Sequence, residues 1–201
     1  MGSGRIRGNR PGGDSGAELR LGVTGHIHIS AKTGRLVARE LTRQLSRVRE
    51  RMDASRTIVG VSCLAPGADS VFAQVLLDLG GRLEVILPTI DYGRSLTADR
   101  DAVTFADLLR RAVSVRAAAP GRPSTAAYVA ANDAMLDSID HLYAVWDGVE
   151  SGAPGSTAHV VATARSRRLP ITVVWPEGAR RSSNPSQGAN PPAAEGSEAL
   201  L

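Results

Sequence analysis

The chain has 201 residues, which is enough for one ordinary domain and short for two. Apolar residues make up 42% and charged residues 22%, a balance typical of globular proteins that excludes a wholly disordered chain. A single cysteine excludes an intrachain disulfide bond, and no apolar run approaches the ~20 residues that a membrane-spanning helix needs.

Short apolar runs alternate with longer amphipathic stretches along most of the chain. Strands are predicted over residues 19–23, 58–63, 83–87, 113–115, 141–146 and 171–175. Helices are predicted over residues 33–52, 69–79, 96–112, 124–138 and 156–168. This alternation favours an α/β fold, namely a Rossmann-like, doubly wound, mainly parallel sheet with helices on both faces, in a single domain.

The two ends of the chain have a different composition. Residues 1–18 are rich in Gly, Arg and Ser, residues 177–201 are rich in Pro, Ala, Ser and Asn, and neither stretch has a periodic apolar pattern. We predict that both are disordered tails around a domain of residues 19–176. The N-terminal stretch has basic residues but no apolar segment of a secretory signal, so we expect a cytoplasmic protein.

Doubly wound sheets bind ligands beyond the carboxyl ends of their strands, at the point where the strand order reverses. The first loop at such a position contains Gly22, Thr24, Gly25 and His26. Its N–H groups can form an anion nest and Thr24 offers a hydroxyl, although a plain glycine turn explains the same residues. No Cys or carboxylate cluster accompanies His26 and His28, so we predict no metal site and no cofactor.

The second loop joins the second strand to the second helix and contains Gly67 and Asp69. Asp69 is well placed to cap the helix. Since a capping carboxylate repels phosphate, its alternative role is to bond sugar hydroxyls or loop N–H groups.

The third loop follows the fifth predicted strand and carries Asp147 and Gly148, and then Gly155, Ser156 and Thr157 at the start of a helix. Small residues at a helix N-terminus leave free N–H groups and the positive end of the helix dipole, which together bind anions. Asp147 can accept hydrogen bonds from ribose hydroxyls or polarise a water molecule. A strand-tip Asp followed by such a helix start favours a functional role over a purely structural one.

Taken in order, these three loops resemble the SLOG superfamily, a Rossmann-like group that includes DNA-processing protein A and the Lonely Guy phosphoribohydrolases. The resemblance covers roughly residues 19–176 and rests on the segments 22–26, 66–69, 79–81, 147–148 and 155–157. It implies binding of a nucleotide or nucleotide-derived molecule, with the first and last loops holding phosphate and sugar. Sequences that have this Val-Thr-Gly-His motif in the first loop and a Trp-Asp-Gly motif in the last loop are similar to bacterial ligand-sensing members, which are either stand-alone or linked to effectors.

One departure bears on catalysis. The Lonely Guy enzymes carry a glutamate three residues after the threonine of their glycine-rich motif, and here that position is Val160. Because a glycosidase needs a carboxylate at the developing oxocarbenium-like centre, Asp147 or Asp69 would have to supply it.

Four functional hypotheses follow. The preferred one is a sensor or binding module for a nucleotide-like small molecule. The first alternative is an N-glycosidase of the phosphoribohydrolase or nucleoside deoxyribosyltransferase type, so enzymatic activity stays open. The others are a single-stranded DNA-binding accessory protein and an inactive scaffold that assembles oligomers.

Neither a membrane nor a nucleic acid is the expected partner, and a homo-oligomer stays open. The sequence pI is near 10.0. However, we interpret the basic residues as spread along the chain and placed at helix ends, with no interleaved aromatics.

Overall fold

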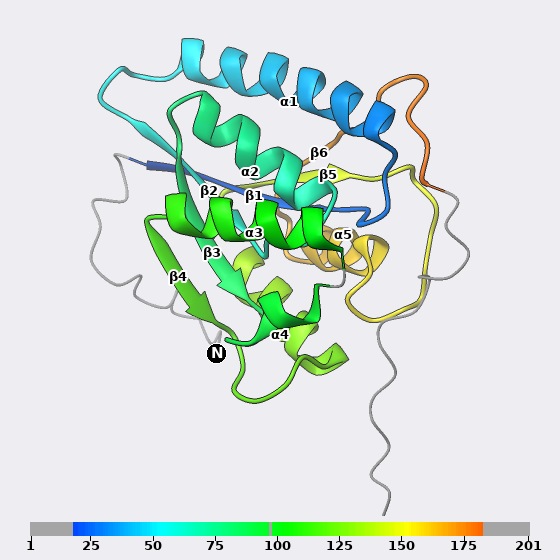
Figure 1. Ribbon diagram of the computed structural model, residues 1–201. Helices are drawn as coiled ribbons and strands as arrows, with labels where there is room; N and C mark the ends of the chain where they lie inside the picture. Colours follow the sequence, from blue (N-terminus) through cyan, green and yellow to red (C-terminus); the bar gives the residue numbers. More distant parts are fainter. Residues whose placement is uncertain (1–17, 97, 183–201) are drawn as a thin grey trace, which may run out of the picture.

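The computed structural model describes residues 18–96 and 98–182 (Figure 1). The predicted tails therefore lie largely outside the described residues. Six residues assigned to the C-terminal tail, 177–182, are described, and they lie against the start of the domain: Ile29 and Arg181 form an antiparallel bridge, and the Ser182 N–H donates to the His28 carbonyl at 3.1 Å. The folded part of the chain thus extends beyond the predicted limit of 176.

Six parallel strands form one sheet, in the order β4-β3-β2-β1-β5-β6. They are β1 (Glu18–Gly25), β2 (Thr57–Ser62), β3 (Arg82–Leu87), β4 (Ser114–Ala117), β5 (His141–Val145) and β6 (Ile171–Val173). The helices are α1 (Ala31–Arg51), α2 (Ala68–Asp78), α3 (Asp99–Arg111), α4 (Thr125–Leu136) and α5 (Thr157–Ser166), and a short 3-10 turn, η1 (Tyr92–Ser95), was not predicted. The doubly wound, single-domain α/β fold is confirmed.

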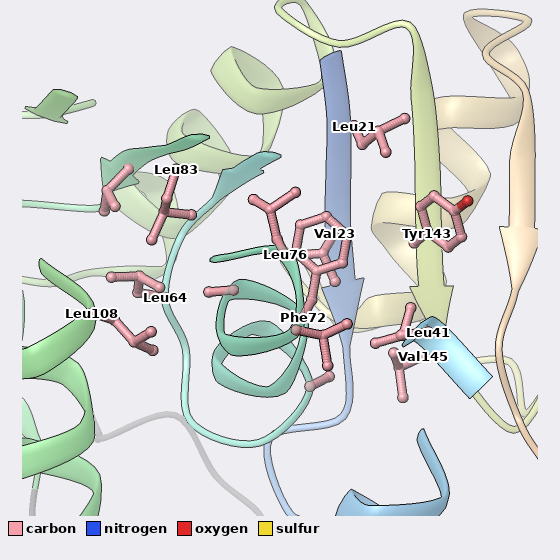
Figure 2. Close-up of a cluster of buried hydrophobic side chains, with 14 of the residues drawn as sticks. Leu21, Val23, Leu41, Leu64, Phe72, Leu76, Leu83, Leu108, Tyr143 and Val145 are labelled. Carbon is pink, nitrogen blue, oxygen red and sulfur yellow. The ribbon is translucent and has the colours of Figure 1, made fainter. Parts of the chain in front are cut away.

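Helices cover both faces of the sheet. The larger core packs α1, α2 and α3 on one face, and the smaller cores pack α4 and α5 on the other. Phe72 of α2 is fully buried against β1, and Leu76 lies beside it (Figure 2). The strands are apolar on both faces because both faces are covered, as expected for a parallel sheet.

Three of the helices begin in the same way. Ser30, Ser124 and Ser156 stand at the N-caps of α1, α4 and α5, and each hydroxyl accepts from the backbone N–H three residues later. Such a bond satisfies one of the four N–H groups that have no partner within a helix. Within the described residues, no helix is both long and apolar enough to cross a bilayer.

Candidate functional site

The strand order reverses between β1 and β5. From β1 the chain moves outward through β2 and β3 to β4, and then returns to place β5 on the other side of β1. At this switch point the two strands end together, because Gly25 is paired with Val145 and the His26 N–H donates to the Val145 carbonyl at 3.1 Å. The carboxyl ends of β1 and β5 are therefore where a ligand of this fold class is expected.

The glycines of the first loop have packing roles. Gly22 lies within β1, and a Cβ there would come within 2.5 Å of Ile139 and 2.6 Å of Met135. A Cβ on Gly25 would come within 2.4 Å of the Ala68 Cβ. Thr24 is buried, with 7% of its surface exposed, and shares the α4–α5 side of β1 with Gly22 because alternate strand residues face the same way.

His26 and Asp147 meet at the switch point. The Nε2 atom of His26 lies 3.1 Å from the Oδ1 atom of Asp147, and its ring packs edge-on against Trp175 with 5.3 Å between centroids. Asp147 also accepts from the Val149 N–H at 3.1 Å, which closes a tight turn directly after β5. The loop residue Gly148 has φ +83, and a Cβ placed on it would meet nothing within 4 Å.

The C-terminal segment brings a cation to the same carboxylate. Arg181 contacts Asp147 through two nitrogens, Nε to Oδ2 at 2.7 Å and Nη2 to Oδ1 at 2.8 Å. This planar two-point pairing is the strong form of an arginine–carboxylate contact. Neither Arg181 nor Trp175 was predicted as a site residue, because residue 181 lies in a stretch whose composition is typical of a tail.

The contacts among His26, Asp147 and Arg181 shift the pKa values of the histidine and the aspartate. Burial alone raises the pKa of Asp147, but hydrogen bonds from Arg181, Val149 and His26 outweigh burial and lower the pKa to about 2. Burial lowers the pKa of His26, and the charge of Arg181 lowers it further against the opposing effect of Asp147. Near pH 7 the cluster therefore holds an ionised carboxylate, a neutral imidazole and a guanidinium.

The second loop buries Asp69. The N-cap of α2 is Gly67, so Asp69 is the second residue of the helix and its carboxylate does not form a side-chain cap. Asp69 instead accepts from the Ser62 hydroxyl at 3.3 Å and from the Ala65 N–H at 3.4 Å, and is 5% exposed. Burial raises its pKa to about 7 against these hydrogen bonds. The prediction that Asp69 caps the helix is therefore wrong. The alternative prediction, a hydrogen bond from a loop N–H to Asp69, describes the structure.

Gly67 is required by close backbone packing. It has φ +79, and a Cβ would come within 2.3 Å of the Ile27 carbonyl oxygen. The next N–H along the chain, that of Ala68, donates to the His26 carbonyl at 3.2 Å. The first and second loops therefore hold each other in place.

The start of α5 follows the Asp147 turn. Ser156 caps it by accepting from the His159 N–H at 3.2 Å, and the His159 ring nitrogen Nδ1 accepts from the Gly155 N–H at 2.8 Å. Thr157 and Ala158 are the first two residues of the helix, where N–H groups have no partner within the helix. The predicted helix start is therefore present, and the His159 ring contacts the backbone N–H of Gly155, just before the helix begins.

Comparison with known proteins bears on the fold. No protein-family model matches the chain, and no curated protein matches it. A solved structure of DNA processing protein A from Streptococcus pneumoniae aligns with 77% of the chain at 14% identity and a TM-score of 0.56. The chain therefore shares the Rossmann-like, doubly wound fold of this protein. The Helicobacter pylori DNA processing protein A aligns with 77% of the chain at 14% identity and a TM-score of 0.55.

The chain spans only part of each of these proteins, 50% of the first and 64% of the second. The arrangement of the strands and helices is therefore similar to that in these proteins. Identities this low support the fold and leave the function to be argued from the site.

Proposed function

We propose that the protein binds a nucleotide or nucleotide-derived small molecule at the carboxyl ends of β1 and β5, as a sensor or ligand-binding module. The observation that carries this proposal is the reversal of strand order between β1 and β5. It gathers the residue 24–26 loop and Asp147 at one edge, immediately before the turn that leads into α5. This is the position at which doubly wound sheets hold nucleotides.

In this proposal the ligand's groups have distinct partners. The N–H groups of Thr157 and Ala158, at the positive end of α5, bind a phosphate. Arg181 adds a cation able to pair with the same phosphate, and Asp147 accepts hydrogen bonds from sugar hydroxyls. The half-buried Trp175 ring offers an apolar surface for the base.

The contacts favour binding over glycosidic cleavage. Asp69 is 5% exposed and bonded within its own loop, so its carboxylate is shielded from a bound substrate. Asp147 is ionised with a pKa of about 2, and therefore holds no proton to give to a departing base. Asp147 is also bonded on both carboxylate oxygens, which lowers its strength as a nucleophile.

A matched pair of variants tests the proposal by thermal shift. Asp147→Ala removes a carboxylate that pairs with an arginine at the site, and Asp133→Ala removes one that pairs with Arg167 between α4 and α5. The panel contains nucleoside monophosphates, nucleosides and ADP-ribose. A compound present at 100-fold its Kd stabilises the fold by ~2.7 kcal/mol, which raises Tm by about 5 °C or more.

We expect such a shift in the wild type and in Asp133→Ala, and a Kd roughly 10-fold weaker in Asp147→Ala, since a hydrogen bond to a charged group contributes about 1.5 kcal/mol or more. An unchanged Kd in Asp147→Ala, or no shift with any compound, would overturn the proposal. Release of a free base by the wild type but not by Asp147→Ala would replace binding with N-glycosidase activity. The Helicobacter pylori protein binds single-stranded DNA. If an oligodeoxynucleotide binds this chain at the same residues, the ligand of the site is single-stranded DNA and not a small molecule.

A further inference from the structure

The outward face of α1 gathers basic side chains. The buried side of the helix is formed by Val37, Leu41 and Leu45. The exposed basic residues are Lys32, Arg35, Arg39, Arg43, Arg47, Arg49 and Arg51. Five of the arginines recur at every fourth position from Arg35 to Arg51, and all five are exposed, although each step turns them by about 40° around the helix axis. α1 itself lies at the outside of the molecule, over α2 (Figure 1).

This helix holds the positive charge of the chain. Its residues include seven basic and two acidic side chains, Glu40 and Glu50, for a net charge of +5. The whole chain has a net charge of +4. All the other residues together are therefore slightly acidic, and the charge is a local property of α1 rather than of the whole chain.

Most arginines of α1 form no ion pair with the part of the chain that the structure describes. Arg43 pairs with Glu40, and Arg49 donates to the Leu79 carbonyl. Among residues 18–96 and 98–182, no ion pair forms at Arg35, Arg39, Arg47 or Arg51.

Arginines on other elements are paired more often. Arg20 contacts Glu84, Arg167 contacts Asp133, and Arg111 contacts Asp107. Within the described residues, the repulsion among the α1 arginines is only partly offset, chiefly by Glu40 near Arg43 and Arg47, and an external polyanion would reduce it.

The C-terminal segment extends this surface. The Arg180 N–H donates to the Thr33 hydroxyl at 2.8 Å, and that hydroxyl donates to the Arg180 carbonyl at 2.8 Å. An exposed seventh arginine thus stands beside the first turn of α1. We call Lys32, the six arginines of α1 and Arg180 the α1 basic face.

The chemistry of this face fits a phosphate backbone better than a lipid surface. A helix that lies in a membrane needs a free apolar side, and the apolar side of α1 is buried in the core. Guanidinium groups pair with phosphates in planar, two-point contacts. α1 has no aromatic side chain on which unstacked bases could stack, so contacts are limited to the backbone.

We propose that the α1 basic face binds the phosphate backbone of double-stranded DNA, independently of base sequence. From Arg35 to Arg51 the face spans ~24 Å at 1.5 Å per residue. One DNA strand offers a phosphate every 3.4 Å along the axis, so about seven phosphates lie within that length. Arg35, Arg39, Arg47 and Arg51, which form no ion pair within the described residues, each neutralise one of them, which sets the salt dependence of binding.

Fluorescence anisotropy with a labelled 20-base-pair duplex tests this proposal. Four phosphate contacts give a slope of about −3.6 for log K against log salt, so affinity falls on the order of 100-fold between about 50 and 200 mM salt. The test variant replaces Arg35, Arg39 and Arg47 with Gln, a good helix former. The matched control replaces three exposed arginines on other elements, Arg116, Arg122 and Arg168, so that both variants have the same net charge.

We expect the test variant to lose about three quarters of the salt slope, to about −0.9, while the control keeps the wild-type slope. Circular dichroism and Tm establish that both variants are folded. Equal losses in the two variants, tighter binding to a single strand of the same length, or no duplex binding at about 50 mM salt would overturn the proposal. Binding to phosphatidylserine vesicles in place of the duplex would assign the face to a membrane surface.

Discussion

Replacement of Asp69 by Asn tests whether this residue is a structural group or part of the ligand site. The carboxyl group is buried among Ser62, Cys63 and Ala65, and burial raises its pKa from 3.8 to about 7. Asn keeps the size of the side chain and one accepting oxygen but has no titratable proton. The variant therefore removes the pH dependence that Asp69 gives to the free energy of unfolding.

The magnitude follows from the rise of the Asp69 pKa from 3.8 to about 7, since a tenfold change in a proton-binding constant is worth ~1.4 kcal/mol. Because the folded-state pKa lies above the unfolded one, the folded state binds the proton more tightly. The stabilisation is fully present below about pH 4 and is lost as the pH rises towards 7. Between pH 5 and pH 8 the loss is about 3 kcal/mol.

The assay is urea unfolding of the wild type and Asp69→Asn at each pH unit from 5 to 8. The quantity to follow is the difference in free energy of unfolding between the two proteins, since His26 and the other titrating groups contribute equally to both. We expect this difference to move by about 3 kcal/mol in favour of the variant as the pH rises. A difference that stays flat would mean an ordinary carboxylate in contact with water, and would return Asp69 to the candidate site.

Two further predictions concern the edge of the sheet. Gly25→Ala is expected to destabilise the fold by about 3 kcal/mol, since the new Cβ would lie 2.4 Å from that of Ala68, whereas Gly152→Ala, with nothing within 4 Å, changes stability by less than ~1 kcal/mol. Urea unfolding measures both, and equal costs would contradict the packing role of Gly25. Ser156→Ala and Ser124→Ala each remove a hydroxyl N-cap and are expected to cost about 1 kcal/mol of unfolding free energy, but only Ser156→Ala weakens the nucleotide-like ligand in the thermal-shift panel. A ligand affinity that falls equally in both variants would argue against phosphate binding at α5.

The order of the elements could be predicted because alternating apolar runs and amphipathic stretches report directly which faces are buried. Each predicted strand and helix is present, with bounds that differ by a few residues. The edge formed by β1 and β5 was also predictable, since strand-end loops of a parallel sheet converge on one side.

Contacts between distant segments could not be predicted in the same way. Arg181 reaches Asp147 across 34 residues of chain, and nothing in the composition of that stretch indicates that it folds back. Asp69 was interpreted as a helix cap because capping is the commonest role of Asp at a helix start, whereas here the cap is Gly67, a glycine with positive φ that lies two residues earlier. The arginine spacing in α1 was visible in the sequence, but the helix was interpreted only through its apolar side.

The central claim is that a nucleotide-like ligand binds at the carboxyl ends of β1 and β5. The most direct test is a titration of the isotope-labelled protein with the compound that gives the largest thermal shift, followed by the backbone amide signals in NMR spectra. The account predicts that the largest shifts occur at His26, Thr157 and Ala158, at the switch point and the start of α5. Shifts that gather at the amino ends of the strands or on α1, with His26 and Thr157 unmoved, would contradict it.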